Sequence, residues 1–271
     1  MKFNEKMTVI ADNIRSKTGG TEALSLDGMA NGINEVYDKG RTDEQNAFWD
    51  KFTQNGERNW YAYAFIGFTD ECIRPNRKIV PRGCATADNI PSYAYMFHYN
   101  SYIKKVEKKY FDFSNINTDK FNISQTTHQL GNRQICHYCT ALEEFEDVGM
   151  PAGYYYYTWA RCGKLHTIEL IRSNADTHFE SAFSVCSSLK NVRFEGEIGR
   201  NLSISYSPLS VESVKDIILH LKDYSGTENA GVYTLTLKDT CKTAMANLGA
   251  IPEFNNKTYD AYITDIGWNL A

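Results

Sequence analysis

A unit of 23 or 24 residues recurs along the middle of this chain, and it constrains the fold more than any other feature of the sequence. Each unit carries two aromatic residues four positions apart, then a cysteine, a leucine and an apolar pair at fixed spacing. The two clearest copies run through these positions: Phe179, Phe183, Cys186, Leu189, Val192 and Phe194, and before them Tyr155, Trp159, Cys162, Leu165, Ile168 and Leu170. A repeat of this length predicts stacked units that bury a continuous core together.

Less regular copies precede these two. One contains Cys136, Cys139, Leu142, Phe145 and Val148, and an earlier one contains Tyr93, Phe97, Asn100, Ile103 and Val106. The period lies in the range of leucine-rich repeats, so we expect an α/β protein with one right-handed solenoid over residues 61 to 208. Within each unit, the alternating apolar pair predicts a strand with one buried face. The aromatic pair predicts a single helical turn that faces inward.

The cysteines of the repeat are expected to form a buried column of free thiols. Cys139, Cys162 and Cys186 share one repeat position, and the chain has an odd number of cysteines, seven. The N-terminus lacks the apolar core of a signal peptide, which also argues against a disulfide framework. The alternative is a zinc site at the C-x-x-C of Cys136 and Cys139. Because the repeat already explains Cys139, we expect no metal and no cofactor.

Both flanks of the repeats differ from them. Residues 1–60 predict a helical assembly or attachment segment with two narrow apolar seams: Phe3, Met7, Ile10 and Ile14, then Leu26, Met29, Ile33 and Val36. Helices this short are marginal alone, so the seams should pack on the first repeat, on another copy or on a partner. Residues 209–271 predict an αβα cap: a helix capped by Ser210, a strand from Val232 to Leu237 and a second short helix.

Charge and hydropathy exclude two classes of partner. The formal net charge is −4, without the basic footprint of a nucleic-acid-binding protein. No run approaches the roughly 18 to 20 apolar residues that span a bilayer, so no membrane insertion is expected.

Three stretches resemble known phage proteins. The unit built on Phe183, Cys186, Leu189 and Val192 resembles the BspA-like leucine-rich repeats of bacterial surface and phage proteins. Residues 10–29 are similar to the opening of phage tail-associated proteins, and residues 267–270 are similar to their end. The resemblance implies a non-enzymatic virion protein, made in the host cytoplasm, that recognises a host-surface glycan or protein. It also implies contact with other tail proteins or with further copies of the chain.

Two groups of residues are candidates for the recognition surface. The outward position between the strand anchors holds an acidic column that ends in a cation: Glu107, Glu146, Glu169 and Arg193. This column could bind a basic or polyhydroxyl partner, or it could be a solvated face. Four consecutive tyrosines cannot all face a core, so Tyr154, Tyr156 and Tyr157 are binding candidates, whereas Tyr155 is an anchor and should be buried. The alternative for these tyrosines is packing against a neighbouring repeat or subunit.

Two other functions remain as alternatives. The first is an adhesion or scaffold protein of the same repeat class, encoded by a bacterium or a prophage. The second is a glycan-degrading hydrolase, which needs two carboxylates in one cleft. The sequence lacks G-x-S-x-G, Walker and H-E-x-x-H motifs, and the carboxylates around Phe145 are expected on a solvated strand edge. We therefore expect no catalytic residues.

Overall fold

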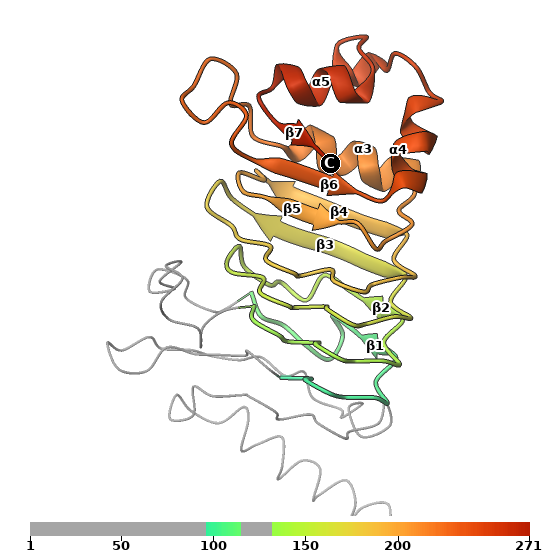
Figure 1. Ribbon diagram of the computed structural model, residues 1–271. Helices are drawn as coiled ribbons and strands as arrows, with labels where there is room; N and C mark the ends of the chain where they lie inside the picture. The colour runs from blue at the N-terminus through green and yellow to red at the C-terminus, as the bar shows by residue number, and fades with distance from the viewer. Residues whose placement is uncertain (1–95, 115–131) are drawn as a thin grey trace, which may run out of the picture. The chain divides into compact units, whose positions relative to one another are not determined.

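The computed structural model describes residues 96–114 and 132–271, which form two parallel sheets and three α-helices (Figure 1). The first sheet holds β1 (Lys105–Val106), β2 (Glu144–Phe145), β3 (Thr167–Ser173) and β4 (Asn191–Gly196). The second holds β5 (Leu202–Ile204), β6 (Thr234–Leu237) and β7 (Asn269–Leu270). The helical segment over residues 1–60 and all its seam residues lie outside the described residues.

The first sheet takes one strand from each copy of the repeat. Its strands follow chain order, β1-β2-β3-β4, and every neighbouring pair is parallel. The register aligns four residues that are equivalent in the repeat: Val106, Phe145, Ile168 and Val192. All four are buried, so the same apolar position points into the core in each repeat.

A bulge in β3 corrects one expected anchor. The register between β3 and β4 shifts between Ile168 and Ile171, and Ile171 then pairs with Phe194. Ile171 is consequently buried, whereas Leu170 is only half-buried. An extra residue in one strand moves the following side chain to the other face, so the expectation that Leu170 fills the core is wrong.

The aromatic pair does not lie on a helical turn, contrary to the expectation from its spacing. Tyr157 has φ 52° and Arg161 has φ 64°, in the left-handed region that an α-helix excludes. Alternate amides, those of Tyr155, Tyr157 and Trp159, instead donate to carbonyls of the next repeat at 2.8 to 3.1 Å. Tyr155 and Trp159 are nevertheless buried, and their stacked rings lie 5.5 Å apart.

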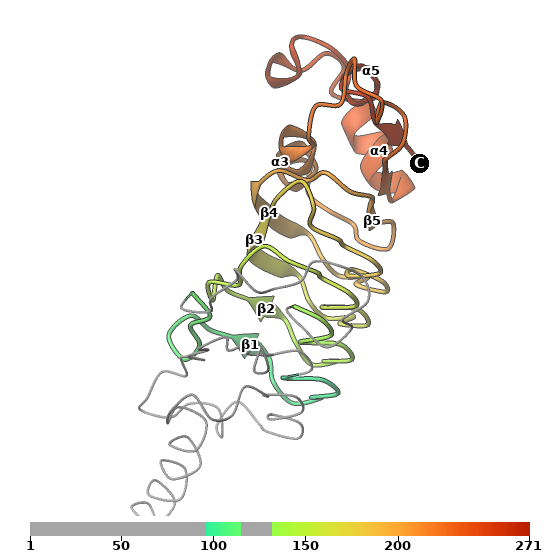
Figure 2. The ribbon, with the colours of Figure 1, turned by 90° about the vertical axis from the view of Figure 1, so that its left-hand side faces the viewer.

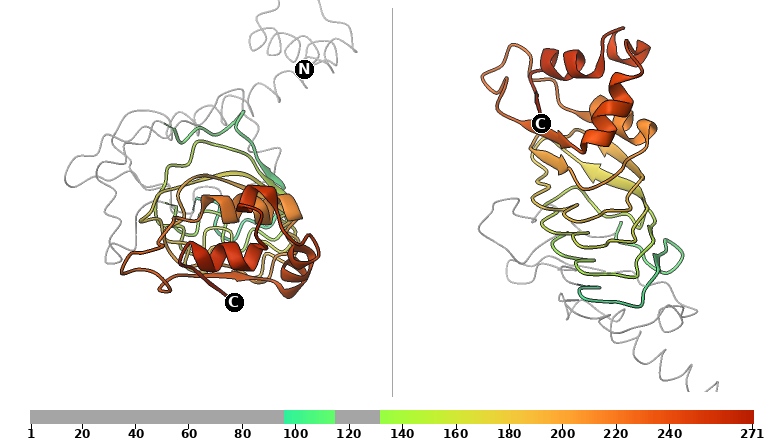
Figure 3. Two further views of the ribbon diagram at one scale, coloured as in Figure 1. Left: turned by 90° about the horizontal axis from the view of Figure 1, so that it is seen from above. Right: turned by 45° about the vertical axis from the view of Figure 1, so that its right-hand side comes forward.

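These return segments form a second ladder of backbone hydrogen bonds. The amides of Gln134, Cys136 and Tyr138 donate to carbonyls 22 residues later in the chain, at 2.8 to 3.0 Å. In Figure 2 the return segments and β5 lie on the side away from β1–β4, and the right-hand view of Figure 3 shows them one above another. Each repeat is therefore hydrogen-bonded to its neighbour on two sides, and the aromatic core lies between them.

The cysteines of the repeat form a buried column, and each thiol donates to a carbonyl of the preceding repeat. The sulfur–oxygen distances are 2.9 Å from Cys139 to Phe97, 2.9 Å from Cys162 to Cys136 and 3.0 Å from Cys186 to Trp159. All three thiols are free, and burial raises their pKa. Ser207 continues the column, since its hydroxyl donates to the carbonyl of Cys186 at 3.0 Å.

The C-terminal part contains α3 (Val211–His220), α4 (Asp239–Ala246), a short 3₁₀ helix (Pro252–Phe254) and α5 (Tyr259–Asp265). Ser210 caps α3 as expected, because its hydroxyl accepts from the amide of Ser213. The expected strand begins at Thr234 rather than Val232, whose side chain is 54% exposed. β5 and β7 were not expected, and β5 precedes residue 209, where the cap was predicted to begin.

Helix α3 covers the free edge of the first sheet. Among the described residues no fifth strand pairs with β4, so its outer amides need other acceptors. The hydroxyl of Ser213 accepts from the amide of Val192 at 3.0 Å, and the carboxylate of Asp216 accepts from Phe194 at 2.8 Å. Two helical side chains thus replace a neighbouring strand.

Candidate functional site

The expected acidic column is aligned on the first sheet. Glu107, Glu146, Glu169 and Arg193 each follow one of the four aligned core residues. Glu169 and Arg193 are exposed, whereas Glu107 and Glu146 are half-buried. The four side chains therefore occupy equivalent positions of successive repeats, Glu107 and Glu146 one residue beyond the ends of β1 and β2.

Two carboxylates of this column bind the chain itself. Glu146 accepts from the ammonium of Lys105 and from the amide of Lys108, each at 2.8 Å. Burial opposes ionisation of Glu146, but these two hydrogen bonds hold its pKa below the ordinary value. Glu169 accepts from the amide of Asp147 at 2.9 Å. Both amides lie just beyond β1 and β2, so the carboxylates replace ladder hydrogen bonds where these strands have ended.

The carboxylates around Phe145 do not lie on a strand edge, which corrects that expectation. Their strand, β2, runs between β1 and β3. Asp147 accepts two hydrogen bonds from Arg172 at 2.6 and 3.0 Å, and these lower its pKa. The Nε of Arg172 lies 3.1 Å from Glu195. This charge network links three repeats.

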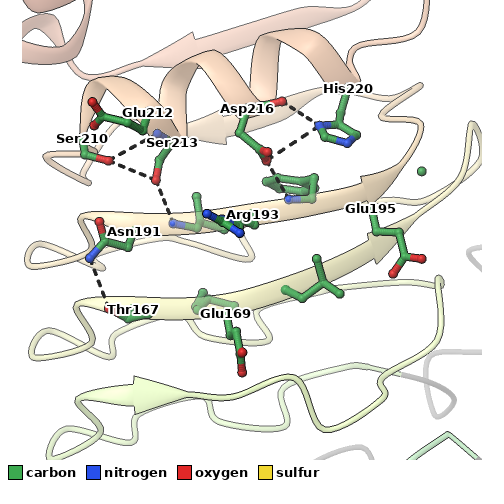
Figure 4. A pocket seen from close by; sticks show the side chains of 15 residues that line it. Thr167, Glu169, Asn191, Arg193, Glu195, Ser210, Glu212, Ser213, Asp216 and His220 are labelled. Carbon is green, nitrogen blue, oxygen red and sulfur yellow. Dashed lines mark hydrogen bonds and ion pairs between the residues drawn. The ribbon is translucent and has the colours of Figure 1, made fainter.

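An open groove of about 920 Å³ lies over β3 and β4, next to α3 (Figure 4). Six charged or titratable side chains line it: Glu169, Arg193 and Glu195 from the strands, and Glu212, Asp216 and His220 from α3. The carboxylate of Asp216 already accepts from the amide of Phe194 in β4. The backbone carbonyl of Asp216 lies 2.7 Å from Nδ1 of His220. Arg193 and Glu212 are the lining charges without a hydrogen bond or ion pair to the rest of the described chain.

Of the four consecutive tyrosines, Tyr155 is buried as the repeat predicts, and none of the other three is exposed. Tyr155 is buried, and its hydroxyl donates to the carbonyl of Arg172 at 2.9 Å. Tyr154, Tyr156 and Tyr157 are half-buried. The hydroxyl of Tyr154 donates to Glu180 at 2.8 Å. The three candidate tyrosines thus lie at the surface of one return segment.

These tyrosines are part of a larger group of rings, which we call the aromatic belt. Successive rings in it have centroids 4.5 to 5.6 Å apart. The belt crosses the return segments of successive repeats and consists of Tyr99, Tyr138, His98, His137, Tyr157, Tyr156, Tyr154 and His178. Tyr99 is 52% exposed, so the belt reaches solvent there.

Two guanidinium groups lie on rings of the belt. Arg161 lies 4.8 Å from the centroid of Tyr138, and Arg133 lies 4.5 Å from that of Tyr156. A guanidinium over a ring face gains cation–π attraction and keeps its N–H edges available. Arg161 is exposed, and no acceptor for its N–H groups lies among the residues that the structure describes.

A histidine pair lies in the middle of the belt. Nε2 of His98 is 3.0 Å from Nδ1 of His137, so one ring donates and the other accepts. Burial, followed by the charges of His98 and Arg161, lowers the pKa of His137 to about 4. The imidazole of His137 is therefore neutral at neutral pH.

Sequence reasoning missed five members of the belt: Tyr99, Tyr138, His98, His137 and His178. A signal existed for two of them, because Tyr99 and Tyr138 directly precede the cysteine position, as Arg161 does. That position is left-handed in each case, with φ between 60° and 64°. An alignment of the repeat on its core residues alone does not reveal that the position before the cysteine recurs at the surface.

Cys136 and Cys139 are buried free thiols, and no group of three or more histidine, cysteine or acidic side chains in the described ranges could hold a metal ion. No helix in the described part is long and apolar enough to cross a membrane. No family model, curated protein or solved structure matches this chain.

Proposed function

We propose that this chain is a non-enzymatic virion protein, associated with a phage tail, that recognises the host surface through a BspA-like leucine-rich-repeat solenoid. The solenoid would span residues 61–208, between a helical segment over 1–60 and a cap over 209–271. Three observations support this fold: one strand per repeat, parallel neighbours in chain order, and return segments bonded from repeat to repeat. The phage context rests on the resemblance of the two chain ends.

The aromatic belt is the observation that carries the recognition role. Tyrosine presents a large amphipathic contact area and loses little entropy on binding, which suits a protein or glycan partner. The belt crosses several repeats, so its rings form a surface wider than any single repeat supplies. Solenoids build binding faces in this way, from equivalent positions of stacked units.

The acidic column is the weaker candidate. Glu146 and Glu169 already accept hydrogen bonds from neighbouring repeats, and a partner would have to displace them. The groove beside α3 offers Arg193 and Glu212, one charge of each sign. The helical segment would bind other tail proteins or further copies of the chain, which leaves the belt free for the host.

Gold-labelled antibody against the chain, applied to purified virions of the phage that encodes it, tests the virion assignment. Label at the tail tip or baseplate is the expected result. Antibody against a capsid protein serves as the matched control, because it should label heads only. Label on bacterial envelopes and none on virions would contradict the assignment and favour the adhesion or scaffold alternative.

A further inference from the structure

We infer that Tyr99, Tyr138 and Arg161 form a binding site for an acidic saccharide, a pyranose that carries a carboxylate or phosphate. This inference rests on the proposed recognition role of the aromatic belt and names the ligand class of that surface. The sugar ring would lie against the tyrosines, and its oxyanion would accept from the guanidinium.

Arg161 supplies the charge. Its planar guanidinium lies 4.8 Å from the ring centroid of Tyr138. The N–H edges of that plane have no acceptor in the described ranges, and a guanidinium edge matches two oxygens of one oxyanion. The carboxylate of Glu180, next to the far end of the belt, already accepts from the hydroxyl of Tyr154. An anion at Arg161 therefore meets no competing acceptor within the belt.

Tyr99 and Tyr138 supply the apolar contact. Their rings are stacked, 4.8 Å apart with planes inclined by 22°. Tyr99 is 52% exposed, so the stacked pair reaches solvent. The C–H face of a pyranose is apolar while its rim is polar, so it fits the outer edges of these rings, whose facing sides are covered by each other and by Arg161. The neighbouring His137, neutral at neutral pH, can donate to or accept from a sugar hydroxyl.

The left-handed backbone supports this assignment. Tyr99, Tyr138 and Arg161 have φ of 60°, 62° and 64°. Val185 has the same conformation at this position of the next repeat, so the backbone is a feature of the repeat and brings equivalent side chains into line. The three side chains follow one another along a single column, one from each repeat.

Isothermal titration calorimetry of the full-length chain tests the site. The probes are a galacturonic acid tetramer and mannose 6-phosphate, and galactose tetramer and mannose are their neutral matches. We expect at least one acidic probe to bind about tenfold more tightly than its match. A comparison of the galacturonic acid tetramer with mannose 6-phosphate shows whether the bound oxyanion is a carboxylate or a phosphate. Arg161→Gln should weaken that binding about tenfold, whereas Lys190→Gln, a change at an exposed cation outside the belt and outside the acidic column, should not.

Three results would overturn the inference: no binding of either acidic probe, equal binding of the neutral matches, or equal losses in the Arg161 and Lys190 variants. Neutral saccharides that bind the parent chain but not Tyr138→Ala would retain the belt as a recognition surface and refute only the acidic ligand. The antibody labelling of virions tests the proposed function independently of this binding site. Circular dichroism of each variant checks that the exposed substitutions leave the fold intact.

Discussion

At the residue scale, the repeat depends on side chains in an unfavourable backbone conformation. Two positions of the unit are left-handed without being glycine: Tyr99, Tyr138, Arg161 and Val185 before the cysteine position, and, in the three units described there, Gln134, Tyr157 and Ser181 four residues earlier. The left-handed region costs roughly 1 to 2 kcal/mol for a residue with a Cβ, and more for a β-branched one. The stacked repeats must therefore compensate for this strain through the ladders and the aromatic core.

Val185→Gly should stabilise the protein. Val185 is 39% exposed and has φ 60°, so glycine relieves the strain and removes little packing. Glycine also loses more chain entropy on folding, which leaves a net gain of about 0.5 to 1 kcal/mol. Urea denaturation measures this change in the free energy of unfolding. The matched control is Val232→Gly, an exposed valine outside the left-handed region, which should destabilise by a similar amount. A loss at both sites would contradict the strain argument.

His137 should make the stability depend on pH between about 4 and 6.5. Its folded pKa is about 4, against 6.5 in a model peptide, so the unfolded chain binds the extra proton within this window. Stability therefore rises with pH through the window, is fully present above 6.5 and is lost as pH falls towards 4. Urea midpoints at pH 7 and pH 4.5 should lie closer together in His137→Gln than in the parent. An unchanged difference would contradict the neutral pair.

At the element scale, the cysteine column should be inert in the folded protein. Five cysteines in the described ranges are free and buried, namely Cys136, Cys139, Cys162, Cys186 and Cys241, and burial raises the pKa of each thiol. In a Cys72→Ser, Cys84→Ser background, a thiol reagent should label them only as the chain unfolds. Val232→Cys, at an exposed site, should react at once in the same background. Rapid labelling of the folded background protein, without Val232→Cys, would contradict the buried column of thiols.

Helix α3 should stabilise the first sheet through Asp216. Its carboxylate accepts from the amide of Phe194, and Asp216→Ala leaves that amide without its acceptor. The expected loss is about 1 to 2 kcal/mol in urea denaturation. Asp216→Asn keeps an acceptor oxygen and should recover part of the loss. Glu212→Ala, on the same helix without a partner, should cost less than either, and an equal cost would contradict the edge contact.

The sequence predicted elements well where local and long-range signals agreed. Ser210 with Val214, Ile217 and Ile218 marked both the start and the buried face of α3. β5 and β7 are three and two residues long, too short for a period of two to register. The i, i+4 aromatic pair misled because Tyr155 and Trp159 reach the same core through left-handed turns rather than through a helix. The β3 bulge has no local signal, since Leu170 and Ile171 are equally apolar.

The sequence predicted the alignment of the candidate column but not the contacts that its members make. Glu146 and Glu169 each follow a core residue that pairs with the other, Phe145 and Ile168. Their hydrogen bonds reach amides 22 or 38 residues away, which spacing within one repeat does not reveal. The belt likewise joins side chains from different repeats, such as Tyr99 and Tyr138. It can be predicted only when the way in which the repeats stack is known.

At the scale of the whole molecule, recognition would follow from repetition. Each return segment is too small to bind a partner alone, but hydrogen bonds between repeats hold the segments in register. The register aligns left-handed positions, and the rings at those positions form one surface. The first sheet and α3 supply the rigid support, while their own charges are largely paired.

Binding of the full-length chain to an array of bacterial surface glycans, with Tyr138→Ala compared with Tyr206→Ala, tests the recognition role of the belt most directly. Tyr206 is 52% exposed, as Tyr99 is, and no ring contact in the described part joins it to the belt. We predict that Tyr138→Ala removes most of the parent's binding and that Tyr206→Ala retains it. Equal binding by both variants and the parent would contradict the belt as the recognition surface.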